Sequence, residues 1–209
     1  MAEKLGKIEK PEAEHFTSKR KLYLVPLIFS GEKAPHEYVE KFNLYWEQVD
    51  EHVVNLEAKI GKVNHIYHES ITLAGEDGLK TIEKLSPSSY QIARKKCQNG
   101  AELEVTEDKE IAEENMDWER FFLIGFISQK VAKLVSELYL EASKKRYEYI
   151  AQIVDETLKA SEVGILFIQE DHKLQFPQDM EVFSVAPPAL DEIRRWQRNR
   201  VSTDTGDEQ

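Results

Sequence analysis

The sequence predicts an α/β fold with a small mixed or parallel sheet of about four strands and a large helical insertion between the second and third strands. Two short apolar runs, at residues 22–29 and 163–168, have the length and composition of buried strands. Between them, residues 75–160 show only helical patterns. Strand and helix patterns that alternate along one chain are typical of α/β proteins.

The first expected strand is the run LYLVPLIF at residues 22–29, which basic residues and Ser30-Gly31 bound. Its unbroken apolar character predicts that both faces are buried. Pro26 has no N–H to donate to a ladder of hydrogen bonds. We therefore expect this strand to lie at an edge of the sheet or to carry a bulge.

A long helix is expected after Pro35, because the missing N–H of proline would be unpaired in the first turn of a helix anyway. The apolar residues that follow alternate in spacing between three and four, so their side chains share one stripe. This stripe comprises Val39, Phe42, Trp46, Val49, Val53, Leu56 and Ile60. Gly61 comes next and favours a helix end.

The second expected strand is KVNHIYHESI at residues 62–71. Alternation along a strand places His65 and His68 on opposite faces, so they cannot ligate one metal ion together. The helical zinc motif of metalloproteases also needs histidines four residues apart, whereas these are three apart. We expect one of the two histidines to be buried with a hydrogen bond and the other to be exposed.

Several helices are expected in the insertion, at about residues 75–160. A short one covers residues 76–85, Ser86 begins the next, and Thr106 is expected to cap another. Residues 126–163 contain neither glycine nor proline. A helix over all of them would be about 57 Å long, whereas a compact chain of this length is roughly 40–45 Å across. The helix therefore either breaks near residues 143–146 or projects from the body of the protein.

The C-terminal part returns to strands. Residues 163–168, VGILFI, are apolar on both faces and are expected in the centre of the sheet, and residues 180–185 at an edge. Pro187-Pro188 opens a final helix. We expect one domain over residues 19–197, with polar, disordered tails at 1–18 and 198–209.

Composition narrows the functional classes. The net charge is −11, with 28 Lys and Arg against 39 Asp and Glu, which disfavours nucleic acid as a partner. No apolar run approaches the roughly 20 residues of a membrane span, and the first 20 residues lack the apolar core of a signal peptide. The single cysteine, Cys97, can form no internal disulfide. We expect a soluble cytoplasmic protein with no membrane partner.

Polar residues follow two of the expected strands, where open α/β sheets bind their ligands. His68 and Glu69 end the second strand, and Glu170, Asp171 and His172 follow the third. Imidazole and carboxylate groups can bind a divalent metal or act as an acid and a base. These five residues are the candidate catalytic set of a small-ligand or divalent-metal site whose metal, cofactor and substrate are unknown.

The alternative function is a non-catalytic interaction protein that forms homo-oligomers through a long amphipathic helix. A projecting helix within residues 126–160 would expose Ile127, Val131, Leu134 and Leu138, a surface that monomers rarely keep. Two-fold self-association is the commonest way to cover such a surface. The sequence therefore predicts a homodimer through this helix.

A second alternative comes from the stretch VDETLKASEVGILFI, a helix that leads into a buried strand. Over roughly residues 150–185 the chain resembles the start of the third domain of archaeal and eukaryotic peptide-chain release factors and Pelota. The Gly-Gly-Gln tripeptide of release factors is missing from the sequence. What the resemblance implies is a translation- or RNA-associated factor without release activity.

Overall fold

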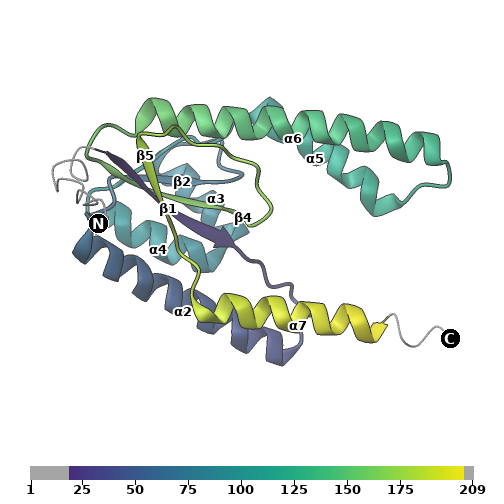
Figure 1. Cartoon of the computed structure of the whole chain (residues 1–209), viewed down its shortest axis with the longest axis horizontal. Helices are drawn as coiled ribbons and strands as arrows, with labels where there is room; N and C mark the ends of the chain where they lie inside the picture. The colour runs from purple at the N-terminus through teal and green to yellow at the C-terminus, as the bar shows by residue number, and fades with distance from the viewer. Residues whose placement is uncertain (1–18, 205–209) are drawn as a thin grey trace, which may run out of the picture.

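The computed structural model describes residues 19–204 and shows an α/β protein with one sheet between layers of helices (Figure 1). All strand pairs of the sheet are parallel, and the strand order is β3-β2-β4-β1-β5. The strands are β1 (Arg20–Leu27), β2 (His65–His68), β3 (Glu102–Leu103), β4 (Val163–Gln169) and β5 (Met180–Ser184). The helices are α2 (His36–Lys59), α3 (Gly75–Leu85), α4 (Pro87–Gln98), α5 (Lys109–Ile124), α6 (Gln129–Thr157) and α7 (Pro188–Asp204). The predicted α/β class is confirmed, with five strands where the sequence indicated about four.

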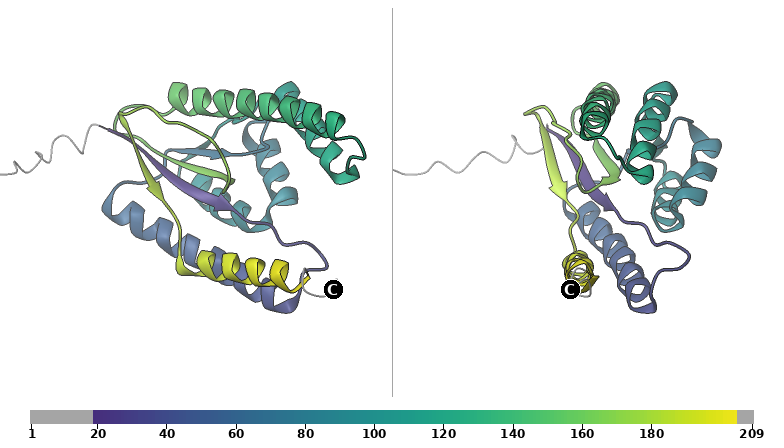
Figure 2. Two further views of the ribbon diagram at one scale, coloured as in Figure 1. Left: turned by 45° about the vertical axis from the view of Figure 1, so that its right-hand side comes forward. Right: turned by 90° about the vertical axis from the view of Figure 1, so that its right-hand side faces the viewer.

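Figure 2 shows helices on both faces of the sheet. Two apolar cores hold these layers together. Alternate residues of the strands face opposite sides of the sheet, so Ile165 and Phe167 join one core and Leu166 and Ile168 the other. The first core lies against α2, α3, α4 and α7. The second lies against the C-terminal half of α6, through Tyr147, Ile150, Val154 and Leu158.

The predictions for β4 and β5 are confirmed. β4 lies between β2 and β1, and its first six residues are all buried. This position explains why residues 163–168 have no polar face. β5 is at an edge of the sheet, where its side chains alternate between partly buried and exposed after Met180.

The predicted position of the first strand is wrong. β1 lies inside the sheet, between β4 and β5, and its register with β4 runs without a bulge from Lys21 to Leu27. Pro26 is tolerated because β5 pairs with β1 only as far as Leu24, whose carbonyl accepts the N–H of Val185. The backbone of Pro26 faces the same side of β1 as that of Leu24, but Pro26 lies beyond the last residue that pairs with β5. Its carbonyl instead accepts a hydrogen bond from the hydroxyl of Tyr45 at 2.5 Å.

The sequence had indicated that residues 75–160 contain only helices, and this prediction is wrong. β3 lies among them and pairs with β2, His65 beside Glu102. A strand of two residues is too short to show an alternating pattern. The predicted cap is also two residues early, because Asp108 caps α5 by accepting the N–H groups of Glu110 and Ile111. Thr106 accepts the N–H of His68.

α6 resolves the choice between a broken and a projecting helix. It continues through residues 143–146 as one helix of 29 residues, about 43 Å long. Its C-terminal half covers the sheet, whereas its N-terminal half extends beyond the sheet beside α5 (Figure 1). We call α5, the connecting turn and residues 129–143 of α6 the projecting hairpin.

α7 continues through residues 198–204, which the sequence placed in a C-terminal tail. Residues 1–18, the expected N-terminal tail, and residues 205–209 lie outside the described part of the chain. Among residues 19–204, no helix has the length and apolar character needed to cross a membrane.

Candidate functional site

The structure gives the five predicted site residues different partners. His68 and Glu69 are buried together where β2 ends. Glu170 is exposed and pairs with Arg194 of α7. Asp171 is exposed, and Nδ1 of the half-buried His172 accepts the N–H of Leu174 at 3.2 Å. Only the first two therefore share one polar network.

His68 is held as a neutral side chain inside this network. Its Nδ1 lies 2.7 Å from the carbonyl oxygen of Glu69, and its Nε2 lies 3.0 Å from the hydroxyl of Ser89. Burial lowers the pKa of His68 to about 4. The expected buried histidine of the HIYHE segment is thus His68. The other histidine, His65, was expected to be exposed, but only 15% of its side chain is exposed.

Glu69 lies beside the buried ion pair of Arg146 and Glu107, and it makes a longer ion pair with the same arginine. Arg146 of α6 donates two hydrogen bonds to Glu107, at 2.7 and 2.5 Å. Its nearest contact with Glu69, from Nη2 to Oε2, is 3.7 Å, and that oxygen has no hydrogen-bond partner. Burial raises the pKa of Glu69 to about 7, although Arg146 opposes the rise.

Glu69→Gln should therefore make stability less sensitive to pH. The pKa of Glu69 in the folded protein lies above its ordinary value of 4.5. The contribution of this group to the free energy of unfolding is therefore fully present below pH 4.5 and is lost as the pH rises through 7. The glutamine side chain cannot titrate. The free energy of unfolding of the variant should therefore exceed that of the wild type by about 2–3 kcal/mol at pH 8.5 and by much less at pH 5. Urea unfolding at both pH values measures the difference.

His68 titrates in both proteins, so its own pH dependence cancels in this comparison. The control is Glu47→Gln, which makes the same substitution at an exposed position on α2. A difference between Glu69→Gln and wild type that stays constant with pH would contradict the account.

The projecting hairpin carries a second feature, a large exposed apolar surface. At its tip, Leu123 is 84% exposed, Ile124 81% and Ile127 completely exposed. Further apolar side chains on the same hairpin are about half exposed, namely Met116, Phe121, Phe122, Val131, Leu134 and Leu140. The two helices contact each other through Phe122 and Tyr139, and through a hydrogen bond from Ser143 to Asn115. They leave the rest of this apolar surface open to solvent.

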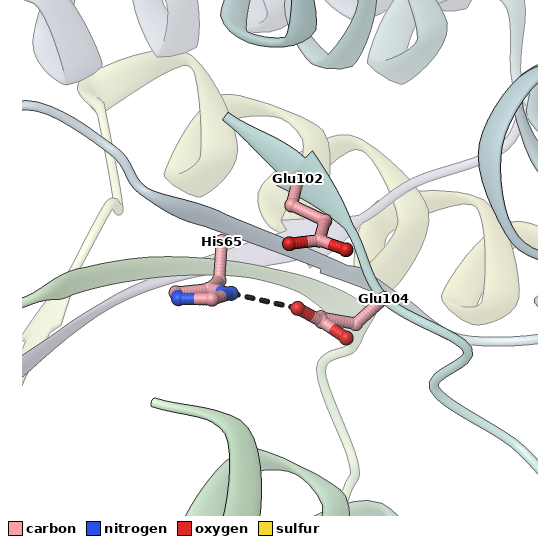
Figure 3. Close-up of side chains that lie close together, drawn as sticks. All are labelled: His65, Glu102 and Glu104. Carbon is pink, nitrogen blue, oxygen red and sulfur yellow. Dashed lines mark hydrogen bonds and ion pairs between the residues drawn. The ribbon is translucent and has the colours of Figure 1, made fainter. Parts of the chain in front are cut away.

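A third feature is a group of possible metal ligands at the other end of β2. His65, Glu102 and Glu104 each offer a ligand atom, and these atoms lie within 4.8 Å of one another. Figure 3 shows the three side chains directed toward one another from neighbouring strands. His65 is only partly buried, and its ring also contacts Glu162. The sequence did not indicate this group, because the pairing of His65 with Glu102 depends on the two-residue strand β3.

The fold and these features define an α/β protein with a five-stranded parallel sheet and a projecting helical hairpin. Comparisons with protein-family models, with curated proteins and with solved structures found no match to the chain.

Proposed function

We propose that this chain is a non-catalytic interaction protein that forms a homodimer through the projecting hairpin. The observation that carries the proposal is the exposed apolar surface of the hairpin, above all Leu123, Ile124 and Ile127 at its tip. Monomeric proteins seldom leave a continuous surface of this kind uncovered. Two such hairpins side by side would form a four-helix bundle, which buries one apolar face of every helix.

The charges of the hairpin favour a second copy as the partner. Residues 110–119 of α5 contain five acidic residues and no basic one. The start of α6, at the opposite end of the hairpin, carries Lys130 and Lys133, and no acidic residue precedes Glu137. In an antiparallel two-fold pair, the basic start of each α6 lies beside the acidic start of the other α5. This arrangement matches opposite charges on both sides of the apolar contact.

The same acidic residues disfavour a membrane as the partner. The cytoplasmic surface of membranes is negatively charged and attracts basic segments. α5 instead presents Glu113, Glu114 and Asp117 to solvent, where each forms an exposed ion pair within the chain. A second protein chain can meet these carboxylates with Lys130 and Lys133, whereas an anionic lipid surface would repel them.

Leu134→Glu should dissociate the dimer. Leu134 is 54% exposed on the hairpin, and a carboxylate there would have to lose its water in the interface. Light scattering at about 50 µM should give twice the 24.3 kDa of the chain for the wild type, and the mass of one chain for the variant.

The matched control is Leu85→Glu, because Leu85 is the last residue of α3, which is not part of the hairpin, and is 48% exposed. It should remain dimeric. A wild-type mass of one chain, or a Leu134→Glu variant that stays dimeric, would overturn the proposal. Co-sedimentation of a monomeric wild type with phosphatidylserine vesicles would assign the apolar tip to a membrane instead.

The small-ligand or metal site at the carboxyl ends of the strands is the second candidate function. One observation favours it, namely the Oε2 atom of Glu69, a buried acceptor without a hydrogen bond. A ligand that donates a hydrogen bond to this oxygen would compensate for its lost hydration. Glu170, Asp171 and His172 contribute to such a site only if their separate contacts rearrange.

A further inference from the structure

We propose that His65, Glu102 and Glu104 form a binding site for a divalent transition-metal ion. Backbone hydrogen bonds of the sheet fix the relative positions of the three residues. The N–H of Glu102 donates to the carbonyl of Asn64 at 2.8 Å, and the N–H of Glu104 donates to that of Ile66 at 2.9 Å. These bonds bracket His65, so the backbone needs no rearrangement to present the three side chains to one point.

The hydrogen bonds of the His65 ring support a metal ligand. Its Nε2 lies 3.1 Å from Oε2 of Glu162, and its Nδ1 lies 2.7 Å from Oε1 of Glu104. A protonated ring donates to both carboxylates, whereas a neutral imidazole has only one N–H and donates to one of them. With the N–H directed to Glu162, the lone pair of Nδ1 faces Glu102 and Glu104. A metal ion at that position would satisfy the nitrogen and both carboxylates.

Glu162 then has the part of an outer carboxylate that orients a histidine ligand. Metal-bound histidines usually donate their other N–H to a carboxylate or a carbonyl, which fixes the ring and its tautomer. Glu162 is itself held in place, because its Oε2 accepts the backbone N–H of Lys159 at 2.7 Å. Three ligands, His65, Glu102 and Glu104, are therefore present, and Glu162 supports the first of them.

The ligand atoms lie within 4.8 Å of one another, so movements of the side chains alone can bring them around one ion. Two ligands about 2.1 Å from one zinc ion, at tetrahedral angles, lie about 3.4 Å apart. The Nδ1 of His65 and Oε1 of Glu104 are 2.7 Å apart, so they must separate by less than 1 Å. Glu102 is exposed and can turn toward the site while keeping it open to solvent. Water would complete the coordination of the ion.

The donor set selects the class of metal. An imidazole nitrogen favours zinc and other transition metals, whereas magnesium and calcium prefer oxygen ligands alone. Three protein ligands with an open position resemble the pattern of exchangeable or catalytic zinc sites more than closed structural ones. The inference is independent of the proposed dimer, because all three ligands belong to one chain.

Isothermal titration of the full chain with Zn²⁺ tests the site. We expect one Zn²⁺ per chain, no heat of binding with Mg²⁺, and loss of the binding in His65→Gln and Glu102→Gln. Glu102 is exposed, so its substitution should leave the fold intact, which circular dichroism verifies. Glu162→Gln should weaken the affinity about 10-fold or more, because it removes the charge that orients His65.

The matched control is His36→Gln, since the exposed His36 lies 3.5 Å from Glu40 in another pair of histidine and glutamate. It should bind Zn²⁺ as the wild type does, and so should the monomeric Leu134→Glu variant. Absence of Zn²⁺ binding by the wild type would overturn the proposal. Binding that survives in correctly folded Glu102→Gln and His65→Gln would overturn it as well.

Discussion

Arg146→Met should lower the free energy of unfolding by about 3–5 kcal/mol at pH 7.5, because it leaves the charge of Glu107 buried without a partner. The side chain of Glu107 is 1% exposed, and that of Arg146 is 11% exposed. Glu107 would keep one hydrogen bond, from the backbone N–H of Ser70 at 2.5 Å. Methionine preserves most of the apolar stem of arginine, so the loss reports the ion pair and not a cavity. Urea unfolding measures it.

Lys144→Met is the control for this substitution. Lys144 precedes Arg146 by two residues on α6, but it is exposed and lies 3.7 Å from the exposed Glu148. Exposed ion pairs of this kind contribute little, so the variant should change stability by less than about 1 kcal/mol. Equal effects of the two substitutions would show that the burial of Glu107 has no energetic consequence.

Gly78→Ala should destabilise the protein by about 3 kcal/mol. Alanine normally stabilises the interior of a helix by up to about 1 kcal/mol relative to glycine. At Gly78 in α3, however, an added Cβ would lie 2.3 Å from the carbonyl oxygen of Leu73 and 2.9 Å from Cδ2 of Leu103. The oxygen belongs to the backbone, so α3 or the preceding turn must move. Thermal unfolding should show a clearly lower midpoint.

Gly31→Ala is the matched control, because a Cβ on Gly31 meets no heavy atom within 4 Å and the residue needs no left-handed backbone conformation. It should be neutral or slightly stabilising, since alanine restricts the unfolded chain. If Gly78→Ala instead stabilises the protein as an ordinary helix substitution does, the close approach of α3 to Leu73 is absent in solution.

The predictions that were confirmed depend on local patterns with one strong period. The stripe of α2 places Trp46, Val49 and Val53 in the core, as its spacing required. β4 is buried on both faces, as its unbroken apolar sequence indicated. The projecting course of α6 was one of two outcomes that its length allowed. In each case the residues that form the element also carry the information that predicts it.

The candidate sites depend on contacts between distant residues, which local patterns do not contain. His68 and Glu69 were identified because polar residues ended a strand, but their neighbour Arg146 is contributed by α6. The His65 group was missed because it needs the pairing of β2 with the two-residue strand β3. The pairing of β5 with β1 was equally hidden, and because it ends at Leu24 it permits Pro26 inside the sheet.

The sequence by itself determined the α/β class, the long helix α2, the central β4 and the amphipathic character of α6. It did so because burial on one face or on two selects residues at a period of 3.6 or 2. Only the tertiary structure decided the strand order, the burial of Glu69 beside the ion pair of Arg146, and the meeting of His65 with Glu102 and Glu104. These features follow from which distant segments pack together, and that choice depends on the apolar area buried between segments, which no single segment contains.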